Sequence, residues 1–594
     1  MKHLAGILVL SAFLCTHSAF SGSKIGGRLA GQLHSHGSQD SYAVWVTFTD
    51  KGPDVLRKTS NPSSLLSERS LQRRRNVLPA DALVDEADLP VERFYVNALL
   101  ATGVSIRQQS RWFNAASVVA SKDQISTIAL LPFVKEVELV GKYGRRRDEV
   151  PVDGAPPPAA PLTKTGGVYS LDYGPSINQL LQIHVTAVHD LGNHAEGVIV
   201  GVFDNGFRLL SHEAFANMNI IATHDFVDHK TSVVPDNPGT DFGDHGVNTL
   251  STIGGYKPGQ LIGPAFGASF ILARTENDSS ETPVEEDNWL AAIEWADSLG
   301  VQVTSTSLGY GNDPQYPYPP PYTSWTWEDM NGRTTLISRA AAMAVRKGIV
   351  VLNSAGNGGY NATHNTLNAP SDADSVVAVG AVSLGGDRTS FSSVGPSTSI
   401  PPHIKPDVMA LGTGVYIASA FDPHGYSPFG QGTSFSCPLA AGVAALLVKA
   451  KPTASPMDIV NALKQTASRA STPDNLMGWG IVNAKAALDR LMGTDTNVTP
   501  GVPVSYALDQ NFPNPFNPGT KIGFRVPGPA WVHLAVYDLL GREVALLVNE
   551  FLAAGDYRWS FDAAGLSSGM YFYRLEESGA DTKIVETRKM VVLR

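Results

Sequence analysis

The chain has 594 residues, of which 43% are hydrophobic and 17% charged, and its formal net charge at pH 7 is −10. This composition is ordinary for a folded protein, and the length predicts several domains rather than one. The acidic balance, with no stripe of Lys and Arg along the sequence, argues against a nucleic-acid partner.

Residues 1–21 predict a secretory signal peptide. Lys2 precedes a mostly apolar run from Leu4 to Cys15, and small residues around position 20 resemble a cleavage site. The run is too short to span a membrane as a helix. We therefore expect an exported chain.

The chain has only two cysteines, Cys15 and Cys437. Cys15 would leave with the signal peptide, so no intrachain disulfide is expected in the mature chain. A lipoprotein signal at Cys15 is the alternative, but the preceding Ala12-Phe13-Leu14 lacks the small residues that such processing prefers.

Residues 22–148 predict a small α+β domain, because alternating strands interleave with a helix. Ser121 is followed three residues later by Gln124, a capping-box pattern that marks a helix start. The expected strands are 42–49, 104–110, 116–121 and 134–140.

A Pro-rich linker follows at residues 149–165. The basic stretch GRRR at 144–147 lies just before it. This stretch is either a processing site or a solvated charge cluster, and the sequence leaves both interpretations open.

Residues 166–493 predict an α/β domain. Short β-branched runs alternate with helical segments that are closed by Gly, the pattern of repeated βαβ units. Such units form a parallel sheet with helices on both faces and an active site at the carboxyl ends of the strands. The strands are GVIVGVFD, ASFILART, VQVTSTS, GIVVLNSAG and SVVAVGAV, and the helices are NWLAAIEWADSLG and TTLISRAAAMAVRKG.

The last part of the chain changes character after a turn-rich linker at 494–504. Residues 505–594 predict a separate antiparallel β-sandwich, because alternating strands lie between Gly-rich turns. The clearest strands are WVHLAVYD, DYRWSF and GMYFYRL.

Four polar residues of the α/β domain lie at the ends of predicted elements. Asp204 ends a strand, His245 precedes a helix, and Asn357 follows another strand. Ser434 begins an Ala-rich helix that has Pro438 in its predicted first turn. Each has a purely structural alternative: a turn-forming Asp or Asn, a loop histidine, or a helix N-cap serine.

Together the four residues suit acyl transfer better than four separate structural roles. A serine hydroxyl is a weak nucleophile and needs an adjacent base, which His245 would supply. Asp204 would hold the imidazole tautomer and stabilise its charged form. The helix start at Ser434 and the Asn357 amide would donate hydrogen bonds to the developing oxyanion.

Residues 170–490 resemble the subtilase (S8) serine peptidases. The Asp-His-Ser chain order is the order of that family. Any one of the shared motifs is weak, but their order within an α/β pattern is specific. They are D-x-G at 204–206, H-G at 245–246, S-L-G at 307–309, A-G-N at 355–357, KPDVMALG at 405–412 and G-T-S-x-x-x-P at 432–438.

The resemblance implies an endopeptidase with a substrate-binding cleft. It implies that one strand end pairs with extended substrate backbone, and that a second segment walls the pocket for the residue before the cut. The residues expected in these two roles are Ser307, Leu308 and Gly309, and Ala355 and Gly356.

Three positions depart from the family pattern. Val247 stands where threonine is usual, Ser251 where glycine is usual, and Cys437 where threonine is usual. None of them removes a catalytic group. Cys437 is expected to be a buried small side chain, with thiol sensitivity as the alternative.

The flanking regions also resemble known domains. Residues 22–148 resemble a subtilase propeptide, which implies a zymogen whose own propeptide is a partner. The terminal segment, with NFPNPFNPGTKIGF at 511–524, resembles the sorting domains of type IX secretion. That resemblance implies export to the surface or medium of a Gram-negative bacterium and contact with the secretion machinery.

No cofactor is expected, and no metal site is predicted. A set of five aspartates could bind calcium, but it lacks the D-x-D-x-D-G spacing of a calcium-binding loop. The sequence therefore favours the interpretation that these aspartates lie in solvated loops and bind no metal. The members of this set are Asp225, Asp228, Asp236, Asp241 and Asp244. The aromatic insert at 310–332 is either a flap over substrate or a loop packed on its own rings.

The expected product is a monomeric, secreted serine endopeptidase that acts on proteins or peptides. Two rivals remain. One is a surface binding protein on a degenerate peptidase fold, and the other is a peptidase that processes only itself or one dedicated substrate.

Overall fold

The structure is a computed structural model of the chain. It describes residues 24–35, 41–140, 169–236, 242–277, 284–311, 325–493, 506–526, 530–552, 555–578 and 585–593. The predicted signal peptide, the GRRR cluster, both linkers and most of the aromatic insert lie outside these residues. The chain divides into two compact units, residues 1–55 with 89–140, and residues 56–88 with 141–594.

The first unit is an antiparallel sheet with helices, as the sequence predicted. The strand order is β2-β3-β1-β4, and the Ser121 capping box begins α5 as expected. The strands are β1 Tyr42–Phe48, β2 Ser105–Ser110, β3 Ala115–Ala120 and β4 Val134–Leu139. The helices are α1 Gly27–Ser35, α4 Arg93–Leu100 and α5 Lys122–Ala129.

Residues 56–88, here called the arm, depart from the prediction of one continuous domain over 22–148. The arm groups with the second unit. It contains most of the short helix α2 Val55–Thr59, the helix α3 Glu68–Arg74 and two short 3₁₀ turns, η1 Pro62–Ser64 and η2 Glu86–Asp88. Its anchoring side chains are buried arginines rather than a long apolar stripe, so hydrophobic periodicity gave no signal for it.

The second unit contains a seven-stranded sheet in which every neighbouring pair is parallel. The strand order is β13-β12-β11-β10-β5-β9-β6. Five of the strands are those predicted, and the two edge strands β6 and β13 were not assigned. The bounds are β5 Ile199–Asp204, β6 Asn219–Asp225, β9 Ser269–Arg274, β10 Val303–Thr306, β11 Val350–Ser354, β12 Val377–Val382 and β13 Val408–Leu411.

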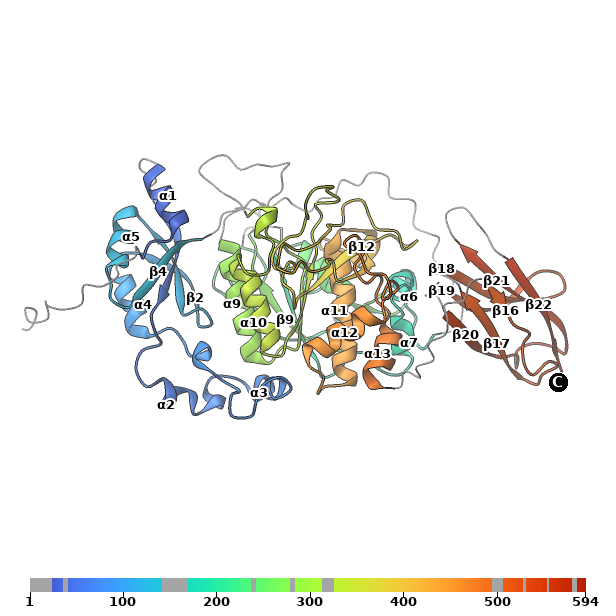
Figure 1. Cartoon of the computed structure of the whole chain (residues 1–594). Coiled ribbons are helices and arrows are strands. Elements are labelled where there is room, and N and C mark those ends of the chain that lie inside the picture. The colour runs from blue at the N-terminus through green and yellow to red at the C-terminus, as the bar shows by residue number, and fades with distance from the viewer. Residues whose placement is uncertain are drawn as a thin grey trace, which may run out of the picture. The chain divides into compact units, whose positions relative to one another are not determined.

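Helices cover both faces of this sheet, which confirms the predicted fold class (Figure 1). Val200 and Val202 belong to the core that α8 and α11 share. Phe203, which points to the opposite face, packs edge-on against Trp289 of α9. The helices are α8 His245–Gly254, α9 Val284–Leu299, α10 Leu336–Arg346 and α11 Thr433–Ala450.

The remaining elements of the second unit's α/β part complete its core. They are α6 Ile177–Leu181, α7 Val185–His189, α12 Pro456–Gln465, α13 Ala484–Met492, the 3₁₀ turns η3 Gly174–Ser176, η4 Glu213–Phe215 and η5 Trp327–Asp329, the two-residue strands β7 Tyr256–Lys257 and β8 Leu261–Ile262, and the hairpin of β14 Thr413–Ala418 and β15 Tyr426–Gln431.

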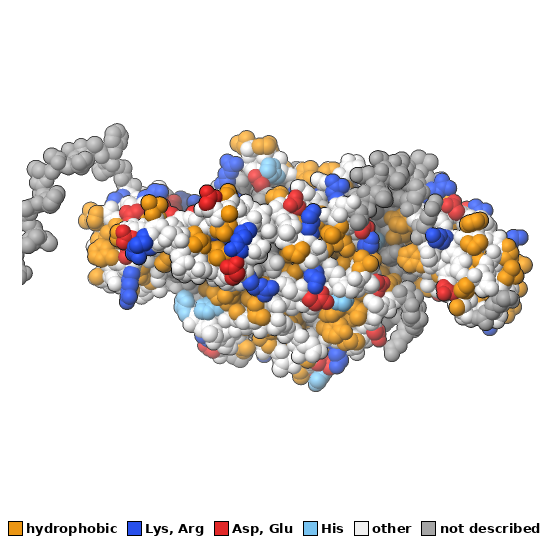
Figure 2. All heavy atoms as spheres, turned by 90° about the horizontal axis from the view of Figure 1, so that it is seen from below, with side chains coloured by type: hydrophobic (Ala, Val, Ile, Leu, Met, Phe, Trp, Pro, Cys, Tyr) orange, Lys and Arg blue, Asp and Glu red, His pale blue; other side chains and the backbone are white. Residues whose placement is uncertain are grey.

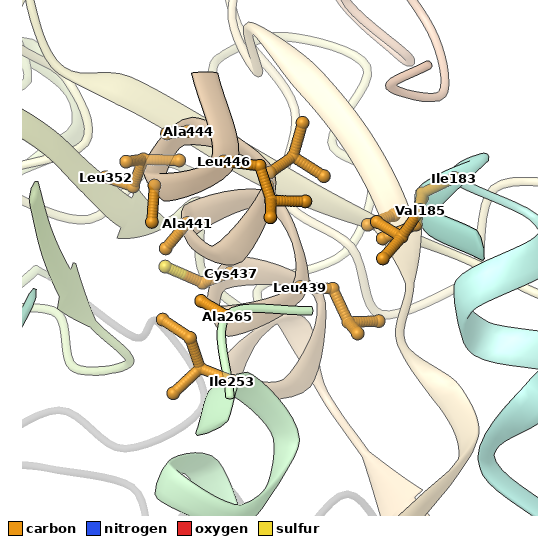
Figure 3. Close-up of a cluster of buried hydrophobic side chains, with 14 of the residues drawn as sticks. Ile183, Val185, Ile253, Ala265, Leu352, Cys437, Leu439, Ala441, Ala444 and Leu446 are labelled. Atoms are coloured by element: carbon orange, nitrogen blue, oxygen red, sulfur yellow. The ribbon is translucent and has the colours of Figure 1, made fainter. Parts of the chain in front are cut away.

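Helix α11 runs through the centre of the core. It is long and apolar enough to span a membrane, but 89% of it is buried within the protein, which identifies it as a core helix. Figure 3 shows Cys437, Ala441 and Ala444 of α11 among Leu352 of β11 and Ile253 of α8. The small residues on this helix let its backbone lie close to the sheet.

Cys437 is expected to be inert to thiol reagents in the native protein. Its side chain is fully buried, and burial raises the pKa of the thiol to about 12, so almost no thiolate exists at neutral pH. Iodoacetamide at pH 8 should leave the intact mass unchanged until urea is added, after which one adduct should appear. Rapid modification of the native protein would contradict this placement.

His189 is expected to make the fold acid-sensitive. Its Nε2–H donates to the Pro264 carbonyl at 2.8 Å, and its Nδ1 lies 2.9 Å from the Tyr173 hydroxyl, which donates to it. Burial lowers the pKa of His189 from 6.5 to about 4. The unfolded chain therefore binds one more proton between these values, so stability falls by about 3 kcal/mol as pH drops from 6.5 to 4.

Thermal unfolding of the wild type and of His189→Gln, followed between pH 4 and pH 7, checks this expectation. The variant should be less stable at pH 7, because it loses a buried hydrogen-bonded ring, but its stability should depend less on pH in this range. Parallel curves for the two proteins would show that His189 is not the group responsible.

The C-terminal region forms two antiparallel sheets, the sandwich that the sequence predicted. One sheet has the order β16-β17-β20 and the other β19-β18-β21-β22, and one apolar cluster contains residues from both. The bounds are β16 Ala507–Leu508, β17 Gly519–Val526, β18 Ala530–Tyr537, β19 Glu543–Leu552, β20 Gly555–Asp562, β21 Gly569–Ser578 and β22 Val585–Val592.

The charged side chains on the face drawn in Figure 2 are mixed in sign. Lys and Arg are interspersed with Asp and Glu rather than gathered in a basic stripe. This face therefore lacks the concentrated positive field that binds a nucleic-acid backbone.

Candidate active site

Asp204 and His245 form a buried hydrogen-bonded pair. Asp204 is the last residue of β5 and is completely buried, and His245 is the first residue of α8. His245 Nδ1 lies 2.7 Å from Asp204 Oδ1. Because a carboxylate only accepts, Nδ1 carries the hydrogen, which leaves Nε2 as the proton-accepting nitrogen of the neutral ring.

Asp204 is ionised despite its burial. Desolvation alone would raise the pKa of its carboxyl, but the charge and hydrogen bond of His245 outweigh that effect. The Asn205 N–H at 2.9 Å and the Thr249 hydroxyl at 2.8 Å add to the stabilisation. The pKa of Asp204 therefore lies below its ordinary value, and the carboxylate stays charged beside His245 in mild acid.

Gly246 allows α8 to begin against the end of β5. A Cβ at this position would collide with the carbonyl oxygen of Gly206 and would lie 3.1 Å from Asp204 Cβ. The Gly246 N–H also donates to the Asn205 side chain at 3.1 Å. The close approach that this glycine permits brings His245 to Asp204.

Ser434 lies in the first turn of α11 and is not its cap. The helix begins at Thr433, and the N-cap is Gly432, whose φ of 137° is a backbone conformation that favours glycine. The structural alternative of a plain N-cap serine is therefore wrong. The first-turn position leaves the Ser434 side chain beside the unpaired backbone N–H groups of a helix N-terminus.

Pro438 lies in the interior of α11, not in its first turn as predicted, because the helix begins at Thr433. A residue here would normally donate its N–H to the Ser434 carbonyl four residues earlier, and proline cannot. The Ser307 hydroxyl donates to that carbonyl instead, at 2.7 Å. Ser434 Oγ donates in turn to the Ser307 carbonyl at 3.2 Å. This reciprocal pair locks the start of α11 to the end of β10.

His245 lies next to this helix start. Its ring centroid is 6.1 Å from that of Phe435, the residue that follows Ser434. The base candidate and the hydroxyl candidate therefore come from two helices that meet at the carboxyl edge of the sheet.

Asn357 directs an amide toward the same place. Its Oδ1 accepts the Thr433 N–H at 3.0 Å and the Thr433 hydroxyl at 2.9 Å. A backbone N–H can only donate, so this contact fixes which atom of the amide is the oxygen. The Nδ2 group is buried without a hydrogen-bond partner among the described residues, and such a donor can bind an oxyanion.

Asn357→Ala is expected to lower kcat roughly 100- to 1000-fold, the range established for loss of this donor in a subtilisin. KM should change little, because the donor acts mainly on the charge of the transition state. Steady-state hydrolysis of a chromogenic peptide measures both constants. Asn361→Ala, in the same loop with only local hydrogen bonds, is the control and should retain activity.

The residues predicted to bind substrate lie close to these groups. The Leu308 carbonyl accepts from Asn353 at 2.8 Å, which fixes the chain just after β10. Side chains at Gly309 and Gly356 would meet Asn368, so both positions are held tightly against that residue. Ala355 is buried at the end of β11.

Sequence reasoning missed three supporting residues, Asn205, Thr249 and Thr433. Thr249 lies four residues after His245 and therefore on the same face of α8, a spacing that could have identified it. Ser251, a departure from the family pattern, donates to the Asn248 carbonyl and accepts from the Ala418 N–H, which ties α8 to β14.

Three members of the acidic set considered for calcium lie beside cations of the chain itself, and a fourth, Asp244, directly precedes α8. Asp225 and Asp228 each lie 2.7 Å from Arg274 Nη1, and Asp236 lies 2.5 Å from Lys230 Nζ. Asp241 lies outside the described residues. Within the described part of the chain, no group of three or more His, Cys, Asp and Glu side chains is arranged to hold a metal ion.

Three family models match the chain. The subtilase family matches residues 195–480, the peptidase S8 propeptide domain of Bacteroidota matches 43–151, and the secretion system C-terminal sorting domain matches 510–592. The sorting domain indicates secretion or a cell-surface location.

Two curated relatives agree with the first match. The chain is 29% identical over 306 residues to subtilisin DY of Bacillus licheniformis, covering 51% of this chain and 96% of the relative. It is 27% identical over 390 residues to subtilisin NAT of Bacillus subtilis subsp. natto, covering 65% and 83%. A solved protease structure from Pseudoalteromonas arctica is similar at 23% identity, covering 54% and 99%, with a TM-score of 0.41.

The matched regions follow one another along the chain, and the Asp-His-Ser motifs fall within the central one. Residues 195–480 form a subtilase-family serine endopeptidase domain, with a peptidase S8 propeptide domain matched before it and a secretion sorting domain matched after it.

Proposed function

We propose that this chain is a secreted serine endopeptidase that cleaves protein substrates through an acyl-enzyme on Ser434. The observation that carries the proposal is the Asp204–His245 pair, at 2.7 Å, beside the helix turn that bears Ser434. A hydroxyl, an oriented imidazole and a buried carboxylate are the groups that acyl transfer to serine requires.

The chemistry follows from the roles of these groups. The Ser434 hydroxyl leaves the Ser307 carbonyl and donates to His245 Nε2, which takes its proton as Oγ attacks the peptide carbonyl. The tetrahedral oxyanion accepts from Asn357 Nδ2 and from the α11 N-terminus. His245 then protonates the leaving amine, and water hydrolyses the ester by the reverse sequence.

We further propose that the substrate lies in extended form against two segments of the peptidase domain. Ser307, Leu308 and Gly309 would pair with its backbone, and Ala355 and Gly356 would border the side chain before the cut. Ser307 and Asn357 follow the carboxyl ends of the neighbouring parallel strands β10 and β11, and this supports the arrangement because substrate and oxyanion donor must be adjacent. A Gram-negative host and the type IX route are also proposed, from the sorting domain.

Covalent labelling tests the nucleophile directly. The full chain, activated with trace trypsin to remove the propeptide, would be treated with a fluorophosphonate, which esterifies serine hydroxyls that a neighbouring base activates. We expect one adduct by intact mass, mapped to Ser434 by peptide sequencing, and none in His245→Ala. No adduct, or an adduct at another serine, would refute the proposed site.

Casein hydrolysis by the same preparation separates the alternatives. Labelling with casein digestion indicates a general endopeptidase. Labelling without casein digestion indicates a peptidase with one dedicated substrate. The absence of both labelling and digestion indicates a binding protein on a peptidase fold.

A further inference from the structure

The C-terminal ends of α9 and α10 together form an acceptor for cations. Asp297 lies in the last turn of α9 and is completely buried. The carbonyls of Val301 and Lys347 follow the two helix ends. Helix C-termini carry unpaired carbonyls and partial negative charge, so an added carboxylate makes this a site for guanidinium groups.

Arg73 of the arm fills this acceptor. Its guanidinium donates to Asp297 Oδ1 at 2.5 Å, to the Val301 carbonyl at 2.6 Å and to the Lys347 carbonyl at 3.1 Å. Burial lowers the pKa of Arg73 to about 10, which leaves it charged at neutral pH. Apart from the neighbouring Ser70 hydroxyl at 3.1 Å, these acceptors all belong to the peptidase domain.

Arg74 links the same acceptor to the interior of the arm. It donates to Asp297 Oδ2 at 2.6 Å and, on its other side, to both oxygens of Asp88 at 2.8 Å. Asp88 also lies 3.0 Å from Lys347 Nζ. Three cations therefore share two carboxylates: Arg73 and Arg74 of the arm and Lys347 of the peptidase domain surround Asp88 of the arm and Asp297 of the peptidase domain. All five side chains are at least 94% buried.

Hydrogen bonds to backbone carbonyls of the peptidase domain extend the attachment beyond Arg73 and Arg74. The Ser67 N–H donates to the Ser298 carbonyl at 3.1 Å, and Asn76 donates to the Pro452 carbonyl at 2.7 Å. Gly300 lets α3 approach closely, because a Cβ there would lie 2.6 Å from Arg69 Cβ.

This acceptor lies at the edge of the sheet away from the candidate active site. Helix α9 ends just before β10 and α10 ends just before β11, so the acceptor adjoins the amino ends of these strands. Ser307 and Asn357 follow their carboxyl ends. With about 3.3 Å per residue, the two sites are roughly 15–20 Å apart. The arm can therefore hold the peptidase domain without occupying its catalytic groups.

We propose that Arg73 and Arg74 anchor the propeptide to this distal acceptor and retain it on the peptidase domain after the linker between them is cut. The occupant is the chain's own arm. Attachment through the arm keeps the rest of the propeptide at high effective concentration near the peptidase domain, so that release of the arm controls the departure of the whole propeptide. The proposal concerns binding alone and stands or falls independently of whether Ser434 is the nucleophile.

The test uses the full chain with Ser434→Ala, so that no self-cleavage occurs, and with a site-specific protease sequence placed in linker 149–165. After cutting, the chain would be immobilised through its C-terminus and release of the propeptide followed by surface plasmon resonance. We expect slow release when the arm is intact. Arg73→Gln should release roughly 30-fold faster or more, because a buried, hydrogen-bonded charge pair loses one partner.

Arg75→Gln is the matched control. Arg75 is the next residue, but it is exposed and, among the described residues, its side chain pairs with Glu68 and Gln72 of the arm alone. The propeptide release rate of this variant should therefore change less than about fivefold. Equal rates for Arg73→Gln and the unmodified arm, or immediate release of the unmodified arm, would overturn the proposal.

Asp297→Asn removes the same contact from the peptidase side, so the test does not depend on the folding of one variant alone. In a double-mutant cycle, Arg73→Gln with Asp297→Asn should release little faster than either single variant, because both remove the same contact. Near-UV circular dichroism before cutting would verify that each variant is folded. Simple multiplication of the two effects would show that the residues act separately and would also overturn the anchor.

Discussion

Ser434→Ala is expected to lower kcat for peptide hydrolysis roughly a million-fold, the scale established for the nucleophile of a subtilisin. Without Oγ no acyl-enzyme can form, and the remaining activity comes from oxyanion binding and substrate positioning alone. Hydrolysis of a chromogenic peptide would be followed after activation of each protein with trace trypsin, which is then inhibited.

The same variant should also stay full length when expressed without the signal peptide, whereas the wild type is expected to lose its propeptide. Intact mass spectrometry reads this directly. Ser436→Ala is the matched control, because Ser436 is a buried serine in the same helix turn whose hydroxyl donates only to the Thr433 carbonyl. Activity of Ser434→Ala within tenfold of the control would show that Ser434 is not the nucleophile.

Asp204→Asn is expected to lower kcat roughly 10,000-fold at neutral pH. An amide in place of the carboxylate can donate to His245 Nδ1, which favours the tautomer with hydrogen on Nε2, and that nitrogen then cannot accept the serine proton. The variant also loses the negative charge that stabilises the imidazolium. Steady-state kinetics from pH 6 to pH 10 would measure the loss.

Stability against acid provides a second measurement for Asp204. The pKa of its carboxyl is lowered in the folded state, so its contribution is present above the ordinary pKa and is lost as pH falls through the folded value. Asp204→Asn should remove that part of the acid dependence. Thr249→Val removes one hydrogen bond to Asp204 but keeps the His245 pair, so it should lose far less activity. Equal losses in the two variants would contradict the role given to the charge.

Local patterns in the sequence predicted much of the fold because those elements are determined by nearby residues. The parallel strands β5, β9, β10, β11 and β12 are short, almost fully buried runs bounded by turn residues, and α5 begins at a capping box made within four residues. The edge strand β6 has an irregular, half-exposed pattern and was not predicted. The arm was missed because its anchors are charged, and burial of charge is decided by a distant partner.

The sequence by itself determined the parallel α/β sheet, the antiparallel C-terminal sandwich and the four candidate residues Asp204, His245, Asn357 and Ser434, because spacing and turn chemistry are local properties. Only the tertiary structure decided that Gly432, not Ser434, caps α11, and that Ser307 takes the carbonyl that Pro438 leaves unpaired. The same holds for Asp297, which lies more than 220 residues from Arg73 and Arg74. Contacts between residues so far apart depend on how the chain packs, and no local pattern encodes them.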